Sequence, residues 1–135
     1  MSVIADTEFV WPIRVYYEDT DAAGVVYYAN YLKFMERARS EWLRALGVEQ
    51  TTLLETLGVV FVVRHVTVDY LKPARFNDAL TVLTRIKRLS QARIRFAQSV
   101  QCDGTLVTSE VEVVCVNALT FKPVKIPDQI LQLLE

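Results

Sequence analysis

The sequence is poor in the residues on which many enzymes rely, since its 135 residues include one histidine and two cysteines. Ser-His-Asp or Cys-His catalysis would have to use His65, which lies inside a strand-like run, and no G-x-S-x-G motif accompanies it. Cys102 and Cys115 also lie in strand-like runs, which favours small buried residues over a disulfide framework or a metal site. Any hydrolytic mechanism would therefore rest on a carboxylate, and we expect no metal or redox cofactor.

The chain also lacks a strong charge and a long hydrophobic run. Its 15 Lys and Arg nearly balance 16 Asp and Glu, so nothing in the net charge favours a nucleic-acid partner. The apolar run Val59–Val63 is far shorter than the roughly 18 residues of a membrane helix. The stretch Met1–Trp11 includes Asp6 and Glu8 and has neither a basic start nor the apolar core of an export signal. We expect a soluble, cytoplasmic protein without a membrane span.

Length and hydrophobic content predict one domain covering residues 1–135. A long amphipathic helix is predicted over residues 30–46, because apolar residues recur at steps of four and three: Tyr31, Met35, Ala38, Trp42 and Ala45. Gly47 is placed to end this helix. Shorter helices are expected at Thr51–Leu57 and at Pro127–Leu134.

Strand patterns account for most of the remaining chain: Phe9–Tyr17, Val59–Leu71, residues 80–87, residues 93–100 and Thr105–Leu119. Pro12 restricts the first strand to an edge or bulged position, and Asp103-Gly104 predicts a hairpin turn. One strand, a long helix and then four consecutive strands favour an α+β fold over a parallel α/β sheet. We expect an antiparallel sheet wrapped around one long central helix.

A cluster of acids stands immediately before the long helix: Glu18, Asp19 and Asp21, with Gly24 after them. Asp21 can supply a nucleophile or a base, while unpaired amides at a helix start can bind negative charge that develops on an oxygen. The simpler interpretation is that Asp19 and Asp21 cap the helix, although one acid would suffice for that role. An EF-hand is disfavoured because its closing glutamate is replaced by Asn30.

A longer pattern surrounds these acids: Val15–Asp21, Gly24–Tyr27, Ala29–Leu32 and Glu36–Arg39, with a second stretch at Asp69–Ala74 and Asp78 after it. The pattern resembles hotdog-fold acyl-CoA thioesterases, in particular the Tol-Pal-associated group, which is similar to 4-hydroxybenzoyl-CoA thioesterase. The resemblance implies an acyl-CoA substrate and a homodimer or homotetramer with active sites at the dimer interface. It also implies an association with envelope or lipid-synthesis proteins.

The resemblance assigns the catalytic carboxylate to Asp21, with Tyr17 nearby, and gives the backbone amide of Tyr28 the task of polarising the thioester carbonyl. Gly24 and Val25, in the same loop, are expected to contact the substrate. The Tol-Pal-associated group commonly has histidine where this chain has Tyr28, and the hydroxybenzoyl branch has tyrosine. The backbone amide survives that exchange, whereas any role of an imidazole does not.

The second half of the chain is rich in basic residues: Lys72, Arg75, Arg85, Lys87, Arg88, Arg93 and Arg95. Such residues commonly form the solvated face of a sheet. If several converge, they can instead hold the phosphates of CoA through charge-assisted hydrogen bonds. Arg88 and Arg93 are the predicted contacts.

The function expected from these observations is hydrolysis of an acyl-CoA thioester, with Asp21 as nucleophile or general base. An Asp21 side chain that points into solvent far from any cavity would overturn the hydrolase prediction. The alternatives are a hotdog dehydratase, which usually needs a histidine paired with an acid, and a non-catalytic module that binds an acyl group or a partner. A homo-oligomer is predicted because Phe34 and Leu43 stand off the main apolar stripe of the helix.

Overall fold

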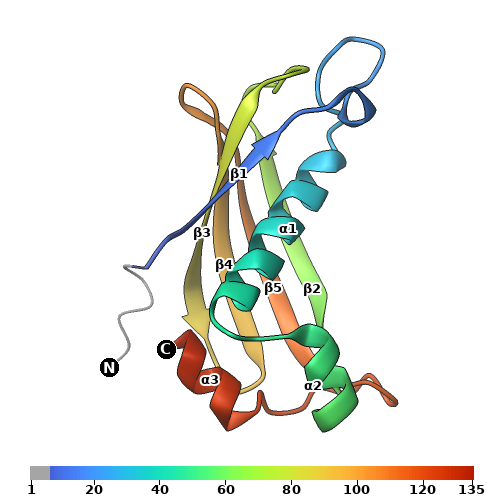
Figure 1. The fold of residues 1–135 in the computed structure, drawn as a ribbon, viewed down its shortest axis with the longest axis vertical. Helices are drawn as coiled ribbons and strands as arrows, with labels where there is room; N and C mark the ends of the chain where they lie inside the picture. Colours follow the sequence, from blue (N-terminus) through green and yellow to red (C-terminus); the bar gives the residue numbers. More distant parts are fainter. Residues whose placement is uncertain (1–6) are drawn as a thin grey trace.

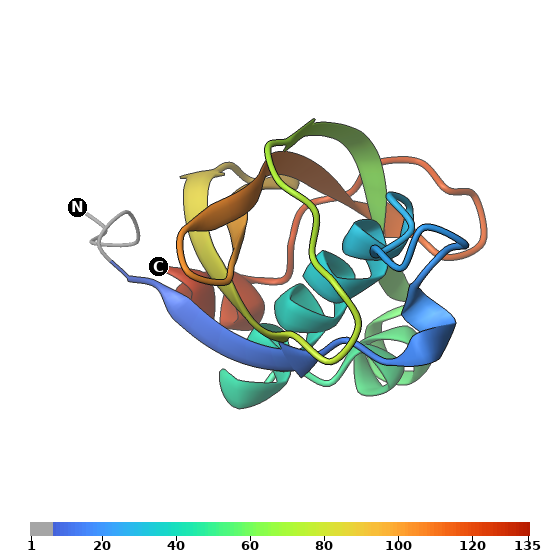
Figure 2. The same cartoon turned by 90° about the horizontal axis from the view of Figure 1, so that it is seen from above.

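The computed structural model describes residues 7–135. Residues 1–6, part of the stretch in which no export signal is expected, lie outside the described range. Five strands form one antiparallel sheet in the order β1-β3-β4-β5-β2: β1 (Phe9–Arg14), β2 (Val59–Tyr70), β3 (Ala79–Leu89), β4 (Arg93–Gln101) and β5 (Thr105–Asn117). The sheet curves around α1 (Asn30–Ala45), as Figures 1 and 2 show. The predicted α+β arrangement is confirmed.

The predicted elements form close to their expected bounds. The first strand ends at Arg14 because Tyr17–Asp19 forms a 3₁₀ turn instead of extending it. Pro12 lies in β1, an edge strand, as predicted. The smaller helices are α2 (Gln50–Leu57) and α3 (Asp128–Leu134), and both lie at the end of the sheet where α1 finishes (Figure 1). No helix within residues 7–135 is long and apolar enough to cross a membrane.

The face of α1 that the sheet covers is wider than the sequence predicts. Phe34 is 1% exposed and Leu43 6% exposed within the single chain, so neither residue requires a second copy to bury it. The oligomer prediction drawn from these two side chains was therefore wrong in its reasoning. The physical cause is the curvature of the sheet, which brings strands against more than one side of the helix.

The hydrophobic core consists of two clusters. The first contains Val15, Phe34 and Leu80 and lies near the start of α1, whereas the second contains Trp42 and Phe96 and lies toward its end. Three buried polar residues occupy the level between them, one on each of α1, β3 and β4: Arg39, Thr84 and Gln98. The core is thus divided by a polar layer.

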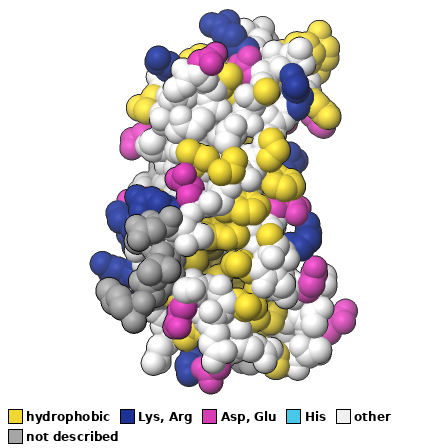
Figure 3. Space-filling model, turned by 60° about the vertical axis from the view of Figure 1, so that its left-hand side comes forward, with side chains coloured by type: hydrophobic (Ala, Val, Ile, Leu, Met, Phe, Trp, Pro, Cys, Tyr) yellow, Lys and Arg dark blue, Asp and Glu magenta, His cyan; other side chains and the backbone are white. Residues whose placement is uncertain are grey.

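The edge strand β2 leaves apolar side chains uncovered. Val63 and Val66 face the α1 side of the sheet but are 52% and 39% exposed, and Leu32 on α1 is 39% exposed. A separate band of hydrophobic side chains runs along the long axis on the side drawn in Figure 3, which is the side of β1 and not of β2. A long edge strand with exposed apolar residues is a surface that can pair with another chain.

Candidate active site

The loop before α1 is fastened by Asp19, which is 9% exposed. Its carboxylate accepts hydrogen bonds from the backbone N–H of Tyr16 at 2.9 Å and from the Nδ2 of Asn30 at 3.2 Å. These bonds join the end of β1 to the first residue of α1. Asp19 therefore acts as a structural tie in the loop.

Asp21 is placed differently, because its side chain is exposed in the single chain. Its Oδ1 accepts a hydrogen bond from the backbone N–H of Ala23 at 2.9 Å, and Gly24 completes the turn with a φ of +79°. Neither aspartate caps α1, since the N-cap position is Ala29 and no side chain bonds there, so the capping interpretation was wrong. Asp21 is not among the residues that line the pocket at the helix start.

The backbone amides at the start of α1 are available. Among residues 7–135, neither the N–H of Tyr28 nor that of Ala29 donates to an acceptor. The carbonyl of Tyr28 accepts a hydrogen bond from the hydroxyl of Tyr70 at 3.2 Å, which holds this segment against β2. Two free amides at the positive end of a helix can stabilise negative charge on an oxygen.

A pocket of about 240 Å³ opens beside these amides, lined by Val26, Tyr28, Tyr31, Tyr70, Leu71, Lys72 and Pro73. The rings of Tyr28 and Tyr31 pack against Tyr70 at centroid distances of 6.1 and 5.6 Å. Burial raises the pKa of Tyr31 and of Tyr70, so both hydroxyls stay protonated at neutral pH. The pocket wall is thus aromatic, with one lysine at its rim.

A second cavity of about 290 Å³ lies further along α1, between that helix and β2. Leu32, Val63, Val66 and Val111 form its apolar wall, and Lys33, Glu36 and Arg39 supply its charged groups. Leu32 follows Tyr28 by one helical turn, and Val66 and Tyr70 lie on the same face of β2. The two cavities share no lining residue, but they follow each other along α1 and β2 from the free amides onward, and together they are called the groove.

Arg39 is the residue of this groove that sequence reasoning missed. It was overlooked because an arginine on an amphipathic helix is ordinarily placed in solvent, yet it is only 9% exposed. Its Nη1 donates to the Oε1 of Gln98 at 3.0 Å. The spacing from Met35 and Trp42, four residues before and three after on the buried stripe, was the available signal.

The ring of Tyr17 stacks on Phe76 with a centroid distance of 3.8 Å, whereas the side chain of Asp21 accepts its hydrogen bond from Ala23. Val25 pairs with Arg75, which brings that arginine next to the loop. Lys72, which lines the pocket, and Arg75 are therefore basic residues that lie beside the loop and the pocket. Nothing in the sequence distinguishes Lys72 and Arg75 from the other basic residues as contacts for CoA.

Arg88 and Arg93 lie at the other end of the sheet. Ala79 starts β3 beside the loop, and Arg88 is about 30 Å further along at roughly 3.3 Å per residue. Figure 1 shows the turn between β3 and β4 at the end opposite the loop before α1. Arg93 pairs with Glu112 at 3.6 Å. One chain does not bring these two arginines together with Asp21.

The histidine and the two cysteines, which the sequence disfavours as catalytic groups, lie in β2, in the turn after β4 and in β5. His65 is an exposed residue of β2 next to an irregularity in its pairing with β5. Cys115 is buried as expected, whereas Cys102 follows β4 in the hairpin turn and is only partly buried. Within the described residues, no group of three or more His, Cys, Asp or Glu is placed to hold a metal ion.

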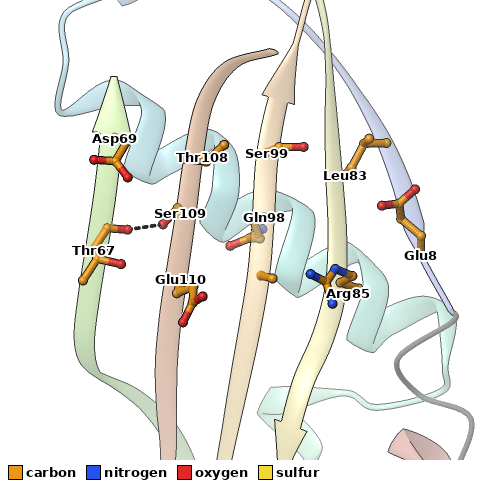
Figure 4. Close-up of a pocket in the computed structure, with 11 residues that line it drawn as sticks. Glu8, Thr67, Asp69, Leu83, Arg85, Gln98, Ser99, Thr108, Ser109 and Glu110 are labelled. Atoms are coloured by element: carbon orange, nitrogen blue, oxygen red, sulfur yellow. Dashed lines mark hydrogen bonds between the residues drawn. The ribbon is translucent and has the colours of Figure 1, made fainter. Parts of the chain in front are cut away.

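A larger hollow of about 360 Å³ lies on the sheet face turned away from α1, and its lining residues are shown in Figure 4. Glu8, Asp69 and Glu110 bring three carboxylates to it, and Arg85 is its one guanidinium. The sheet separates this hollow from the free amides of α1. Its excess of acids is unfavourable for the phosphates of CoA.

Comparison with known proteins identifies the family. Residues 15–134 match the family model described as the thioesterase-like superfamily, and the chain belongs to that superfamily. A solved structure of a probable thioesterase from Bartonella henselae aligns with a TM-score of 0.85 and 41% identity, covering 90% of this chain and 100% of the other. The predicted hotdog fold is confirmed.

Two curated relatives match over nearly their full lengths. An acyl-CoA thioesterase of Haemophilus influenzae is 46% identical over 127 residues, which is 93% of each chain. An acyl-CoA thioester hydrolase of Escherichia coli O6:H1 is 48% identical over 126 residues, covering 92% of this chain and 93% of the relative. The expected resemblance to acyl-CoA thioesterases is confirmed.

Proposed function

We propose that this protein hydrolyses an acyl-CoA thioester to a free acid and CoA. The observation that carries the proposal is the pair of free amides at the start of α1, above an apolar groove, in a member of the thioesterase-like superfamily. The amide of Tyr28 polarises the thioester carbonyl and stabilises the oxyanion. Such donors contribute on the order of 3 kcal/mol where one has been removed.

Asp21 supplies the base or the nucleophile. As a base, its carboxylate takes a proton from water while the water oxygen attacks the carbonyl carbon, and the CoA thiolate then leaves with a proton. As a nucleophile, its oxygen attacks the carbonyl carbon, the C–S bond breaks and CoA leaves as the thiolate. Water then cleaves the mixed anhydride, which releases the free acid and restores the Asp21 carboxylate. Gly24 and Val25 hold the turn that presents Asp21, while Tyr17 supports the loop from its stack on Phe76.

The exposure of Asp21 in one chain is the reason to propose a homodimer. A second copy seated along the edge of β2 would cover Val63, Val66 and the open side of the groove. Antiparallel pairing of two identical edge strands is self-complementary, which suits a two-fold dimer. Assembly of two dimers into a homotetramer stays a prediction.

Lys72 and Arg75 are proposed to hold phosphates of CoA at the mouth of the groove, since both lie beside the loop. Arg88 and Arg93 could act only at a mouth that a second chain completes. No cofactor is required, because CoA is part of the substrate. A cytoplasmic location and an association with envelope or lipid-synthesis proteins stay predictions.

The substitution Asp21→Asn tests the proposal, because it keeps the size of the side chain and removes its charge. We expect kcat for octanoyl-CoA to fall by roughly 10² or more. The melting temperature should stay unchanged, since the side chain is exposed and accepts one local bond. Undiminished hydrolysis by the variant would exclude the role of Asp21.

Substrate panels separate the remaining candidates. Turnover limited to the hydration or dehydration of β-hydroxyacyl thioesters would identify a dehydratase. Binding of acyl-CoA esters without turnover would identify a non-catalytic module. Hydrolysis of short, long or aromatic acyl-CoA esters would support the thioesterase.

A further inference from the structure

Arg39 is a buried cation without an ionic partner. It is 9% exposed, and no carboxylate among residues 7–135 lies within 4 Å of its guanidinium. Burial lowers the pKa of Arg39, and the nearby charge of Glu36 acts in the opposite direction. The Glu36 carboxylate is itself engaged by the hydroxyl of Ser40 at 2.6 Å. A buried charge ordinarily has a partner, so this one needs an explanation.

The guanidinium of Arg39 is held in place by a chain of hydrogen bonds to uncharged groups. Gln98 accepts from Arg39 and donates from its Nε2 to the carbonyl of Met35 and to the hydroxyl of Thr84, both at 2.9 Å. The amide of Gln98 is thereby fixed, with its oxygen turned toward the arginine. This arrangement orients Arg39 without neutralising it.

Most of the donors of Arg39 remain unused. A guanidinium has five N–H groups, and among residues 7–135 the side chain of Arg39 donates to Gln98 alone. Every fully buried side-chain nitrogen or oxygen among the described residues has a partner, so the remaining nitrogens of Arg39 are not sealed in the core. Arg39 lines both the 290 Å³ cavity and a smaller one of about 90 Å³ beyond it. Arg39 thus stands between the two cavities with free donors.

The surroundings favour an anion. Lys33, Glu36 and Arg39 give the larger cavity two positive charges and one negative charge, against walls that are otherwise apolar. An apolar wall strengthens the attraction between a guanidinium and a carboxylate. A hydrocarbon chain lying along such walls would therefore reach a cation rather than a closed apolar end.

The distance along the helix fits an extended acyl chain. Arg39 follows Tyr28 by about three helical turns, on the order of 16 Å along the axis. Long side chains on a helix lean toward its N-terminus, which brings the guanidinium nearer to the free amides. A thioester carbonyl at those amides and a terminal group at Arg39 would belong to one ligand of moderate length.

We propose that Arg39 binds a carboxylate at the distal end of the acyl group, so that the preferred substrates are CoA monothioesters of dicarboxylic acids. The inference rests on the proposed hydrolysis for the placement of the thioester. Arg39 is then the specificity residue of the groove, and Gln98 is its positioning residue.

The test compares suberoyl-CoA with octanoyl-CoA, which share their chain length and differ in a terminal carboxylate or methyl group. For the wild-type protein, KM should be lower for suberoyl-CoA. In Arg39→Met, KM for suberoyl-CoA should rise about tenfold or more, as expected for loss of a hydrogen bond to a charged group. KM for octanoyl-CoA should change less than about threefold, since no charged contact is lost. The matched control Arg37→Gln removes an exposed charge of α1 that lines neither cavity, and it should affect both esters little.

Calorimetric binding of the thioether analogues of the two esters, which cannot be hydrolysed, separates this inference from the proposed function. If neither ester is hydrolysed but the carboxylated analogue binds more tightly through Arg39, the hydrolase proposal fails and the carboxylate site stands. Equal binding of both analogues to the wild-type protein would overturn the site. An equal loss of both in Arg39→Met, or an effect of Arg37→Gln as large as that of Arg39→Met, would overturn it as well.

Discussion

Replacing Asp19 with alanine tests whether the two aspartates before α1 have separate roles. Asp19 is buried and accepts hydrogen bonds from Tyr16 and Asn30, whereas Asp21 is exposed and accepts one bond within its own turn. The sequence presents both as neighbouring acids. Only Asp19 ties together segments that are distant along the loop.

The expected cost follows from these two bonds. A hydrogen bond to a charged group contributes about 1.5–3 kcal/mol, but the freed N–H of the exposed Tyr16 can bond to water, so a net loss of about 2 kcal/mol is expected for Asp19→Ala. An unfolding entropy of about 2.1 cal/mol/K per residue over 135 residues converts this into a fall in melting temperature of about 7 °C.

Thermal unfolding followed by circular dichroism measures this fall, with Asp21→Ala as the matched control at the same protein concentration. The control should melt within about 2 °C of the wild type, since exposed polar substitutions change stability by at most about 0.5 kcal/mol. Hydrolysis should show the opposite ranking, with the larger loss in Asp21→Ala. Similar melting temperatures for the two alanine variants would refute the separation of roles.

Two further predictions concern the sheet. Hydrogen bonds from Arg95 and Arg64 lower the pKa of Glu112, so its stabilising effect is complete above the usual glutamate pKa of about 4.3 and is lost as the pH falls below it. In urea titrations, the free energy of unfolding should therefore fall less from about pH 7 to about pH 3 in Glu112→Gln than in the wild type, and equal falls would contradict this. Val63→Lys should shift sedimentation toward the monomer, and a dimer unaffected by this change would argue against the β2 interface. The control Val10→Lys alters a similarly exposed valine of β1, at the opposite edge of the sheet, and should leave the dimer intact.

The fold could be predicted because its signals are local. The periodicity of Tyr31, Met35 and Trp42 marks α1, while Asp103 and Gly104 both adopt the positive φ that the predicted hairpin turn requires. Such patterns depend on the backbone and on neighbouring side chains, which the sequence lists directly. The resemblance carried by the motif around Asp21 extended this prediction to the family.

The candidate site was only partly predictable. Glu18, Asp19 and Asp21 are all acidic, so the sequence does not show which of them is structural. Asp19 becomes structural only in the folded chain, where its carboxylate bonds to Tyr16 after β1 and to Asn30 at the start of α1. Arg88 and Arg93 were chosen as basic residues without knowledge of which end of the sheet they occupy. A difference of nine residues along a strand moves a side chain by about 30 Å, and the residue type alone does not show at which end of the sheet it lies.

The order of the elements, the loop that carries Asp21 and the superfamily could all be inferred from the amino-acid sequence. The burial of Arg39 against Gln98 and the uncovered apolar edge of β2 became apparent only in the folded chain. Burial and charge pairing depend on strands that are distant in sequence but curve around the same helix. A helical pattern specifies which residues share a face, whereas the sheet specifies how wide that face becomes.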